Sequence, residues 1–264
     1  MMLKKLFARL RRKPGITVSE KRGLRMLHIG GAAIQSAMRL SDPHALALDY
    51  TRCMMAFLLL HPEPSQALMI GLGGGSLAKF FHRRLRAVQI RVVELDARVV
   101  AVARERFCLP PDDERLAVDI GDGTGALAPE CCDVLMVDGY DDERHAAVLV
   151  SQEFYDAAWL ALAEPGVLVV NFMSDDLQLD RYLGRIECAF GGAVLCLPAL
   201  SDPNLIALAL KGAPRAFEWE LLRRRALKLE ERYALPFPRY VEALKRMNRH
   251  TAQHLVLTAE GGGE

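Results

Sequence analysis

The sequence lacks four features that would place it in a special class of protein. No apolar run is long enough to span a bilayer, and the opening MMLKKLFARLRRKPG has no apolar stretch of the kind that a secretory signal contains. The six cysteines form no C-x-x-C pair, and the 264 residues carry a formal net charge of only +1. We therefore expect reduced thiols, a cytoplasmic location, no membrane anchor and no nucleic-acid partner.

The composition is that of an ordinary globular protein, 51% hydrophobic and 25% charged. This length suits one large domain, or one domain with a smaller one attached. The charge is uneven, because residues 1–25 carry nine Lys or Arg and a single acid. A membrane-binding or nucleic-acid-binding patch is one interpretation of this segment. We favour a solvated, partly disordered start over residues 1–22.

Seven short apolar segments alternate with helical patterns from residue 66 onward. Uninterrupted apolar strands separated by helices predict a parallel sheet that is covered on both faces. The last two strands are separated only by SDPN, so they should form an antiparallel hairpin at the sheet edge. The predicted fold class is α/β, with a seven-stranded methyltransferase-like Rossmann sheet whose last pair is antiparallel. The expected strands are QALMIGL, IRVVELD, RLAVDIGD, CDVLMVDGY, GVLVVNFMS, AVLCLPAL and LIALALKG.

The segments around this sheet predict further units. LRMLHIGGAAIQSAMRL alternates apolar and polar residues around a Gly-Gly turn, which predicts a small antiparallel hairpin, and residues 42–61 are expected to form a helix. Helices are also expected over 76–87, 97–107, 151–163 and 175–189. The predicted units are a start at 1–22, an N-terminal hairpin and helix domain at 23–64, a Rossmann-like nucleoside-binding domain at 65–214, C-terminal helices at 215–248 and a tail at 249–264.

The most informative stretch is LMIGLGGGSLAKFF, in which a buried strand turns through glycines into a helix. Gly71, Gly73 and Gly74 would let a ligand lie against exposed backbone N–H groups near a helix N-terminus. A glycine turn can also serve only close packing between strand and helix, so this signal is weak by itself. Position 76 is serine, so the loop is not the G-x-G-x-x-G of dinucleotide-binding proteins.

Acidic side chains follow the next three predicted strands. Glu94 ends the second strand, Asp122 lies in the GDG after the third, next to Gly123, and Asp138 and Asp141 lie in VDGYDD after the fourth. Ligands of doubly wound sheets bind beyond the carboxyl ends of the strands, so these acids should meet at one edge. Each one alone can be a helix cap or a solvated turn. Together they predict a nucleoside pocket beside an acidic patch, and they favour an adenosyl-sulfur ligand over NAD.

From about residue 24 to 245 the sequence resembles the spermidine synthase family, the polyamine aminopropyltransferases. LHIGGAAIQSAM resembles the family's L-x-L-D-G-x-x-Q, and DYTRCM with HPEPSQALMIGLGGG resembles Y-H-E-M and H-P-x-P-x-x-V-L-x-I-G-G-G-D-G. VELD, GDG, VDGYDD and SQEFYDAAWLALAEPGVLVVN are similar to the remaining core motifs. YALPFPRYVEAL resembles the C-terminal F-A-L-P-x-F-V.

The resemblance implies transfer of the aminopropyl group of decarboxylated S-adenosylmethionine to an amine such as putrescine. Methylthioadenosine is then the product, and no cofactor is tightly bound and no metal is required, because the leaving group is a neutral thioether. The family members are commonly homodimers or higher homo-oligomers with small-molecule substrates. Carried over by position, Gln35 would line the thioadenosine pocket, Glu94 would bind ribose and Asp122 adenine. Asp138 would be the base, with Asp141 and Tyr50 placing the amine.

Three departures from the family motifs fall on the amine side. The family has aspartate after its glycines where this chain has Ser76, and glutamate after its tyrosine where this chain has Arg52. Asp142 replaces a proline. Arg52 near a diammonium substrate would repel it by about 1 to 4 kcal/mol. We therefore expect an intact nucleoside half and an altered amine half.

Three hypotheses follow. The first is an aminopropyltransferase with a changed amine site, which Asp138 and Asp141 favour. The second is an S-adenosylmethionine-dependent methyltransferase on the same sheet, for which the sequence offers no specific motif. The third is a non-catalytic relative that binds a nucleoside or a protein partner, which the missing carboxylates favour.

Overall fold

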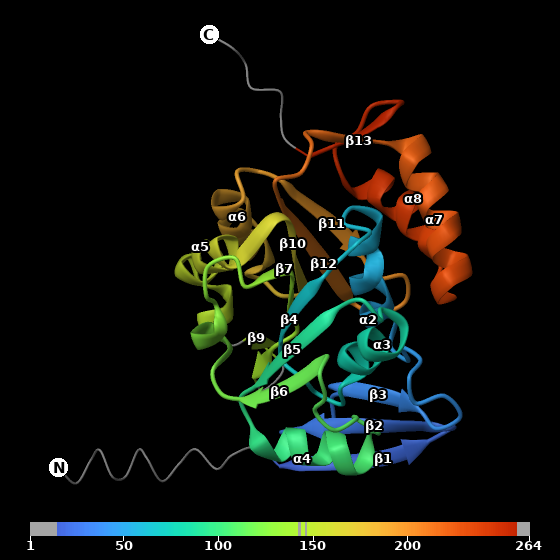
Figure 1. Ribbon diagram of the computed structural model, residues 1–264, viewed down its shortest axis with the longest axis vertical. Coiled ribbons are helices and arrows are strands. Elements are labelled where there is room, and N and C mark those ends of the chain that lie inside the picture. Colours follow the sequence, from blue (N-terminus) through green and yellow to red (C-terminus); the bar gives the residue numbers. More distant parts are fainter. Residues whose placement is uncertain (1–14, 142–143, 146, 258–264) are drawn as a thin grey trace, which may run out of the picture.

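The computed structural model describes residues 15–141, 144–145 and 147–257 (Figure 1). The predictions for residues 1–14, for Asp142 and for the end of the tail from 258 onward lie outside the described residues. The side chain of Asp141 also lies outside the described part, although its backbone forms strand β8 (Tyr140–Asp141), which pairs with β9 (Arg144–His145).

A seven-stranded sheet forms the centre of the molecule, in the order β11-β12-β10-β7-β4-β5-β6 (Figure 1). The neighbours from β10 to β6 are parallel, while β12 runs antiparallel to both β10 and β11. This confirms the predicted methyltransferase-like sheet with an antiparallel final pair. The strands are β4 (Gln66–Ile70), β5 (Gln89–Glu94), β6 (Leu116–Ile120), β7 (Cys132–Val137), β10 (Leu162–Met173), β11 (Val194–Pro198) and β12 (Asn204–Lys211).

Helices cover both faces of this sheet because its strands are apolar on both sides. In β4, Ala67 and Met69 point into one core, and Leu68 and Ile70 point into the other. The first core is covered by α2 (Asp49–Met54), the 3₁₀ helix η1 (Met55–Leu59), α3 (Ser76–Arg84), α7 (Trp219–Tyr233) and α8 (Phe237–Met247). The second is covered by α5 (Gln152–Ala161) and α6 (Leu179–Ala189), on the opposite face in Figure 1.

None of the helices in the described ranges combines the length and the apolar character that a bilayer-spanning segment requires.

The predicted cap of α5 is present, since the Ser151 side chain accepts a hydrogen bond from the N–H of Phe154. The remaining short elements are the 3₁₀ helices η2 (Gly123–Ala126) and η3 (Ala147–Val150), and the C-terminal pair β13 (Ala216–Glu218) and β14 (His254–Val256).

The N-terminal sheet has three strands, β1 (Ile16–Lys21), β2 (Leu24–Ile29) and β3 (Ser36–Arg39). The pair β2–β3 is the predicted hairpin. Strand β1 comes from the residues that we expected to form part of the basic start. It pairs because its apolar residues Ile16 and Val18 pack on a small core with Leu27 of β2. Helix α4 (Ala97–Arg106) completes this core and places the small sheet beside the carboxyl ends of β5 and β6 (Figure 1).

The helix predicted over 42–61 is much shorter, since α2 begins only at Asp49. A distant residue determines this start. The carboxylate of Asp202 accepts hydrogen bonds from the N–H groups of Asp49, at 2.8 Å, and Tyr50, at 3.0 Å, while Asp49 accepts one from the N–H of Ser201. Free N–H groups at a helix start need acceptors, and here they come from the β11–β12 turn.

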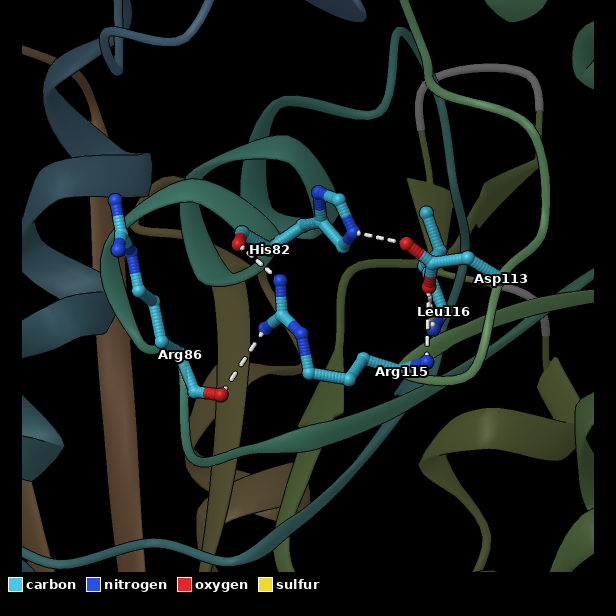
Figure 2. A network of polar contacts seen from close by, with 5 residues as sticks. All are labelled: His82, Arg86, Asp113, Arg115 and Leu116. Atoms are coloured by element: carbon cyan, nitrogen blue, oxygen red, sulfur yellow. Dashed lines mark hydrogen bonds and ion pairs between the residues drawn. The ribbon is translucent and has the colours of Figure 1, made fainter.

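A polar network at the far end of α3 ties this helix to the edge of the sheet (Figure 2). The Arg115 guanidinium donates to the carbonyls of His82, at 2.8 Å, and Arg86, at 3.3 Å. Asp113 accepts from the N–H groups of Arg115 and Leu116 and lies 2.7 Å from the His82 ring. The N–H of Arg115, then the His82 ring and then the N–H of Leu116 lower the pKa of Asp113 to about 2. The network orients α3, whose N-terminus carries the glycine loop.

Candidate active site

A cavity of about 1270 Å³ lies at the carboxyl ends of the parallel strands. Residues that follow β4, β5, β6, β7 and β10 line it from the sheet, and residues of the β2–β3 loop line it from the N-terminal sheet. Its size exceeds the 300 to 1,000 Å³ usual for a small-molecule site. The cavity therefore has room for a nucleoside and a second substrate.

The glycine loop brings backbone directly to the cavity wall. Gly71 and Gly73 line it with φ angles of +95° and +52°, a region that residues with a Cβ rarely adopt. Gly123 lines it from η2, and a Cβ there would lie 2.4 Å from Cγ2 of Ile70. At Gly71 and Gly123 the absence of a side chain is a packing requirement, whereas at Gly73 it is the φ angle that favours glycine.

Gly74 does not line the cavity, in contrast to the prediction that it contacts the ligand. A Cβ on Gly74 would lie 2.8 Å from Oγ of Ser36 and 2.9 Å from Cδ1 of Phe107. This glycine is required for packing of the loop on the N-terminal sheet. The family motif H-P-x-P-x-x-V-L-x-I-G-G-G-D-G can be aligned without gaps on HPEPSQALMIGLGGG. Its aspartate then falls on Gly74 and not on Ser76.

Glu94 lines the cavity at the end of β5 and is held by two backbone groups. Its Oε2 accepts from the N–H of Leu72, at 2.9 Å, and its Oε1 accepts from the N–H of Asp96, at 3.0 Å. A carboxylate oxygen can accept more than one hydrogen bond, so both oxygens retain acceptor capacity. Glu94 therefore orients the glycine loop and presents an acceptor to the cavity at the same time.

Asp122 lines the cavity after β6 and forms the N-cap of η2. Its Oδ1 accepts from the N–H and from the hydroxyl of Thr124, both at 2.9 Å. These bonds fix the rotamer of the side chain. Oδ2 is the oxygen that remains for a donor in the cavity.

Asp138 follows β7 and lies beside Tyr50 of α2. The Tyr50 hydroxyl is 3.1 Å from Oδ2 of Asp138 and 3.4 Å from the backbone oxygen of Gln35, which also lines the cavity. Burial raises the pKa of Asp138, and the hydrogen bonds from Asn171 and Tyr50 act against this rise. A carboxylate with a raised pKa on a cavity wall is a typical proton acceptor.

Two buried asparagines behind Asp138 were not anticipated. The amide nitrogen of Asn171, in β10, donates to Oδ1 of Asp138 at 2.8 Å, and the amide nitrogen of Asn204, in β12, donates to Oδ1 of Asn171 at 2.9 Å. Asn171 is 1% exposed and Asn204 is 8% exposed. Its position near the carboxyl end of the fifth predicted strand is a sequence signal for Asn171, although its side chain is an amide and not an acid.

Arg52 does not line the cavity, and the expected repulsion of a diammonium at this position stays a prediction. Its guanidinium donates to the carbonyls of Leu46, at 2.8 Å, and Ala47, at 2.9 Å. Ser76 does line the cavity, and its hydroxyl contacts the N-terminal sheet, 3.2 Å from Oγ of Ser36. Arg52 is therefore a structural residue that holds the loop before α2.

All charged side chains among the described residues that line the cavity are acidic. The wall holds seven carboxylates and no Lys, Arg or His in the described part of the chain. Four of the seven were not singled out as site residues from the sequence, although three of these lie in MSDDLQ and SDPN, which follow predicted strands. A cavity with this charge attracts cations. The carboxylates are Glu94, Asp96, Asp122, Asp138, Asp175, Asp176 and Asp202.

The doubly wound sheet, the glycine turn and the acids at successive strand ends define a Rossmann-like protein of the methyltransferase type. The profile described as "Spermine/spermidine synthase domain" matches residues 49–183. A protein of Chromobacterium violaceum named polyamine aminopropyltransferase is 37% identical over 246 residues, which cover 92% of this chain and 94% of that protein. The chain belongs to the spermine/spermidine synthase family.

Two solved structures show how widely this fold is used. A probable spermidine synthase from Corynebacterium glutamicum has a TM-score of 0.65 at 20% identity and covers 90% of this chain and 93% of that one. Human methyltransferase-like protein 13, solved in complex with SAH, has a TM-score of 0.64 at 26% identity and covers 71% of this chain and 93% of that one. The first likeness concerns the fold alone.

Proposed function

We propose that the protein is an aminopropyltransferase that moves the aminopropyl group of decarboxylated S-adenosylmethionine to an amine such as putrescine. The observation that carries this proposal is the cavity wall, with seven carboxylates and no basic side chain among its described residues. Both substrates are cations, because one has a sulfonium and an ammonium and the other has two ammonium groups. Membership of the spermine/spermidine synthase family supports the same assignment.

The nucleoside half of the cavity lies on the glycine loop. In this proposal Glu94 accepts hydrogen bonds from the ribose hydroxyls and Asp122 accepts one from the adenine amino group. Gln35 lines the cavity from the β2–β3 loop, and we assign it to the thioadenosine space. Glu94 is suited to this role because its two backbone donors hold it in one orientation.

The amine half is centred on Asp138 and Tyr50. An alkyl ammonium has a pKa of about 10 and must lose a proton before its nitrogen can attack carbon. Asp138 takes up that proton, the new N–C bond forms on the carbon next to sulfur, and the C–S bond breaks with its electron pair going to sulfur. The products are the extended amine and neutral methylthioadenosine. We assign Asp141 to placing the amine with Tyr50, as the family motif implies.

A second candidate is methyl transfer from S-adenosylmethionine, which the likeness to methyltransferase-like protein 13 favours. S-Adenosylmethionine differs from the decarboxylated form by a carboxylate. That carboxylate would enter a wall on which the described charged side chains are all acidic. Electrostatics therefore favour the decarboxylated substrate, which carries one more net positive charge.

Calorimetric titration with methylthioadenosine, S-adenosylmethionine and decarboxylated S-adenosylmethionine tests the proposal. We expect the decarboxylated form to bind more tightly than S-adenosylmethionine, and mass spectrometry to detect spermidine from putrescine. The Asp138→Asn variant is the control for transfer. Preference for S-adenosylmethionine with transfer of a methyl group would support the second candidate, and nucleoside binding without any transfer would indicate a non-catalytic protein.

We also propose that the protein assembles as a homodimer or a higher homo-oligomer, as the family resemblance implies. Sedimentation equilibrium of the full chain measures this directly. A single species at the monomer mass of 29.3 kDa would contradict it.

A further inference from the structure

The side chains of Asn204, Asn171 and Asp138 form a line of hydrogen bonds that runs from β12 through β10 to the end of β7. Each amide nitrogen donates toward the carboxylate, at 2.9 Å from Asn204 to Asn171 and at 2.8 Å from Asn171 to Asp138. The strands lie side by side in the order β12-β10-β7 (Figure 1). The three side chains therefore cross the sheet at the edge where the cavity opens.

The direction of these bonds depends on Asn204. An asparagine amide can present either its oxygen or its NH₂ to a neighbour, and only the NH₂ suits an ionised carboxylate. Asn204 donates to Oδ1 of Asn171, which leaves the NH₂ of Asn171 for Asp138. The same amide nitrogen of Asn204 lies 3.6 Å from the sulfur of Met173, a weak acceptor. Both neighbours of this amide nitrogen are acceptors, so the NH₂ of Asn204 is the donor in both contacts.

We propose that Asn204 is a positioning residue that acts through Asn171: its amide holds the NH₂ of Asn171 on the carboxylate of Asp138. The effect of Asn204 on catalysis rests on the proposed function, in which Asp138 is the proton acceptor. Its effect on the protonation of Asp138 does not. Without Asn204, Oδ1 of Asn171 loses this donor, which weakens the preference for the orientation that presents the NH₂ to the carboxylate. The ionised form of Asp138 then loses a donor and gains a repulsive dipole.

The groups around Asp138 show which of them can stabilise its ionised form. Tyr50 of α2 and Asn171 of β10 donate to its carboxylate, and the loop after β4 presents the backbone of Gly71. The charged groups of the surrounding wall, within the part of the chain that the structure describes, are carboxylates, so none of them is a cation that would stabilise the ionised form of Asp138. They are Glu94, Asp96, Asp122, Asp175, Asp176 and Asp202. Stabilisation of the ionised form therefore comes from dipolar donors.

The test is a carbon-13 NMR titration of the full chain labelled at the aspartate carboxyl carbons, with the Asp138 signal assigned by its loss in Asp138→Asn. We expect Asn204→Leu to raise the titration midpoint of Asp138 by about one pH unit, equivalent to a tenfold change in its proton affinity. In an Asn171→Leu background the same substitution should cause no further shift, because the two residues act through one bond. Asn204→Ala carries the same expectation if the leucine does not fold.

Met173→Leu is the matched control, because it alters packing beside Asn204 without touching the bond to Asn171. It should leave the midpoint of Asp138 in place. An unchanged midpoint in Asn204→Leu, or an equal rise with and without Asn171, would overturn the proposal. The titration needs no substrate. An absence of aminopropyl transfer would therefore refute the proposed function without affecting the test of Asn204. If transfer occurs, the acid limb of kcat/KM should move upward with the NMR midpoint.

Discussion

Gly71 and Asp138 are packed backbone to backbone: a Cβ atom on Gly71 would lie 2.4 Å from the carbonyl oxygen of Asp138. The N–H of Asp138 in turn donates to the carbonyl of Ile70, at 3.0 Å. The glycine loop after β4 and the acid after β7 are thus in direct backbone contact. In the proposed function, the relative placement of the two substrates would depend on this contact.

Gly71→Ala should therefore destabilise the protein and disturb the cavity. The added methyl group meets backbone, which cannot move aside cheaply, and the φ angle of +95° disfavours any residue with a Cβ. We expect the free energy of unfolding in urea to fall by about 3 kcal/mol. Gly184→Ala in α6 is the control, because a Cβ there meets nothing within 4 Å and should be neutral or stabilising. Equal stability of Gly71→Ala and wild type would contradict the close packing.

Glu94→Ala should weaken nucleoside binding. The substitution removes the proposed ribose acceptor and also frees the N–H groups of Leu72 and Asp96. We expect a loss of about 1.5 to 3 kcal/mol in methylthioadenosine binding, measured by calorimetry. Glu94→Gln keeps one oxygen and should lose less. An unchanged affinity in a folded Glu94→Ala protein would remove this residue from the site.

Asp138→Asn should affect chemistry more than binding. The amide keeps the shape of the carboxylate but cannot take up a proton, so kcat should fall by about 10² to 10⁴. Methylthioadenosine affinity should stay near the wild-type value, since Asp138 lies on the amine side. Rapid-quench measurement of spermidine formation and calorimetry separate the two effects. A variant with the full wild-type rate would show that another group accepts the proton.

Arg52→Ala should act on stability and not on attraction of the amine. It removes two hydrogen bonds from the guanidinium to the carbonyls of Leu46 and Ala47. We expect the free energy of unfolding to fall by about 1 to 3 kcal/mol. Arg224→Ala, at an exposed position of α7, should change it by less than about 0.5 kcal/mol. A lower KM for putrescine in Arg52→Ala would instead place its charge at the amine.

Lys79→Met should change how stability depends on pH. Lys79 is 1% exposed and donates to the carbonyl of Phe107 at 2.6 Å, and burial lowers its pKa from 10.5 to about 8. Below pH 8 both states carry the proton and the buried charge costs the folded state about 3 kcal/mol. Between about pH 8 and 10.5 the unfolded chain binds more protons, so wild-type stability should rise relative to Lys79→Met. Urea unfolding across this range measures the difference.

Lys228→Met, on the exposed side of α7, is the control for the loss of a lysine. It should show the same pH slope as the wild type. A wild type and a Lys79→Met variant that run parallel from pH 7 to 10.5 would contradict the lowered pKa.

The local sequence pattern was sufficient to predict the central sheet and the acidic edge of the site. The strands are short apolar runs, and apolar periodicity is a property of neighbouring residues that needs no knowledge of the fold. Parallel strands end at a common edge, so the order of strands and acids along the chain was enough to predict that Glu94, Asp122 and Asp138 meet. All three line the cavity. Their roles toward ribose, adenine and proton stay predictions.

Only the tertiary structure decided which groups hold these acids in place. The start of α2 depends on Asp202, far along the chain from Tyr50, and Asp138 depends on Asn171 and Asn204 from two other strands. Arg52 matched a motif position at the amine but turned to carbonyls of its own loop. Hydrogen bonds need atoms about 3 Å apart in a suitable direction, and for residues so distant in sequence that geometry is a result of packing. Sequence pattern therefore determined the sheet and its acidic edge, whereas packing determined how each acid is oriented.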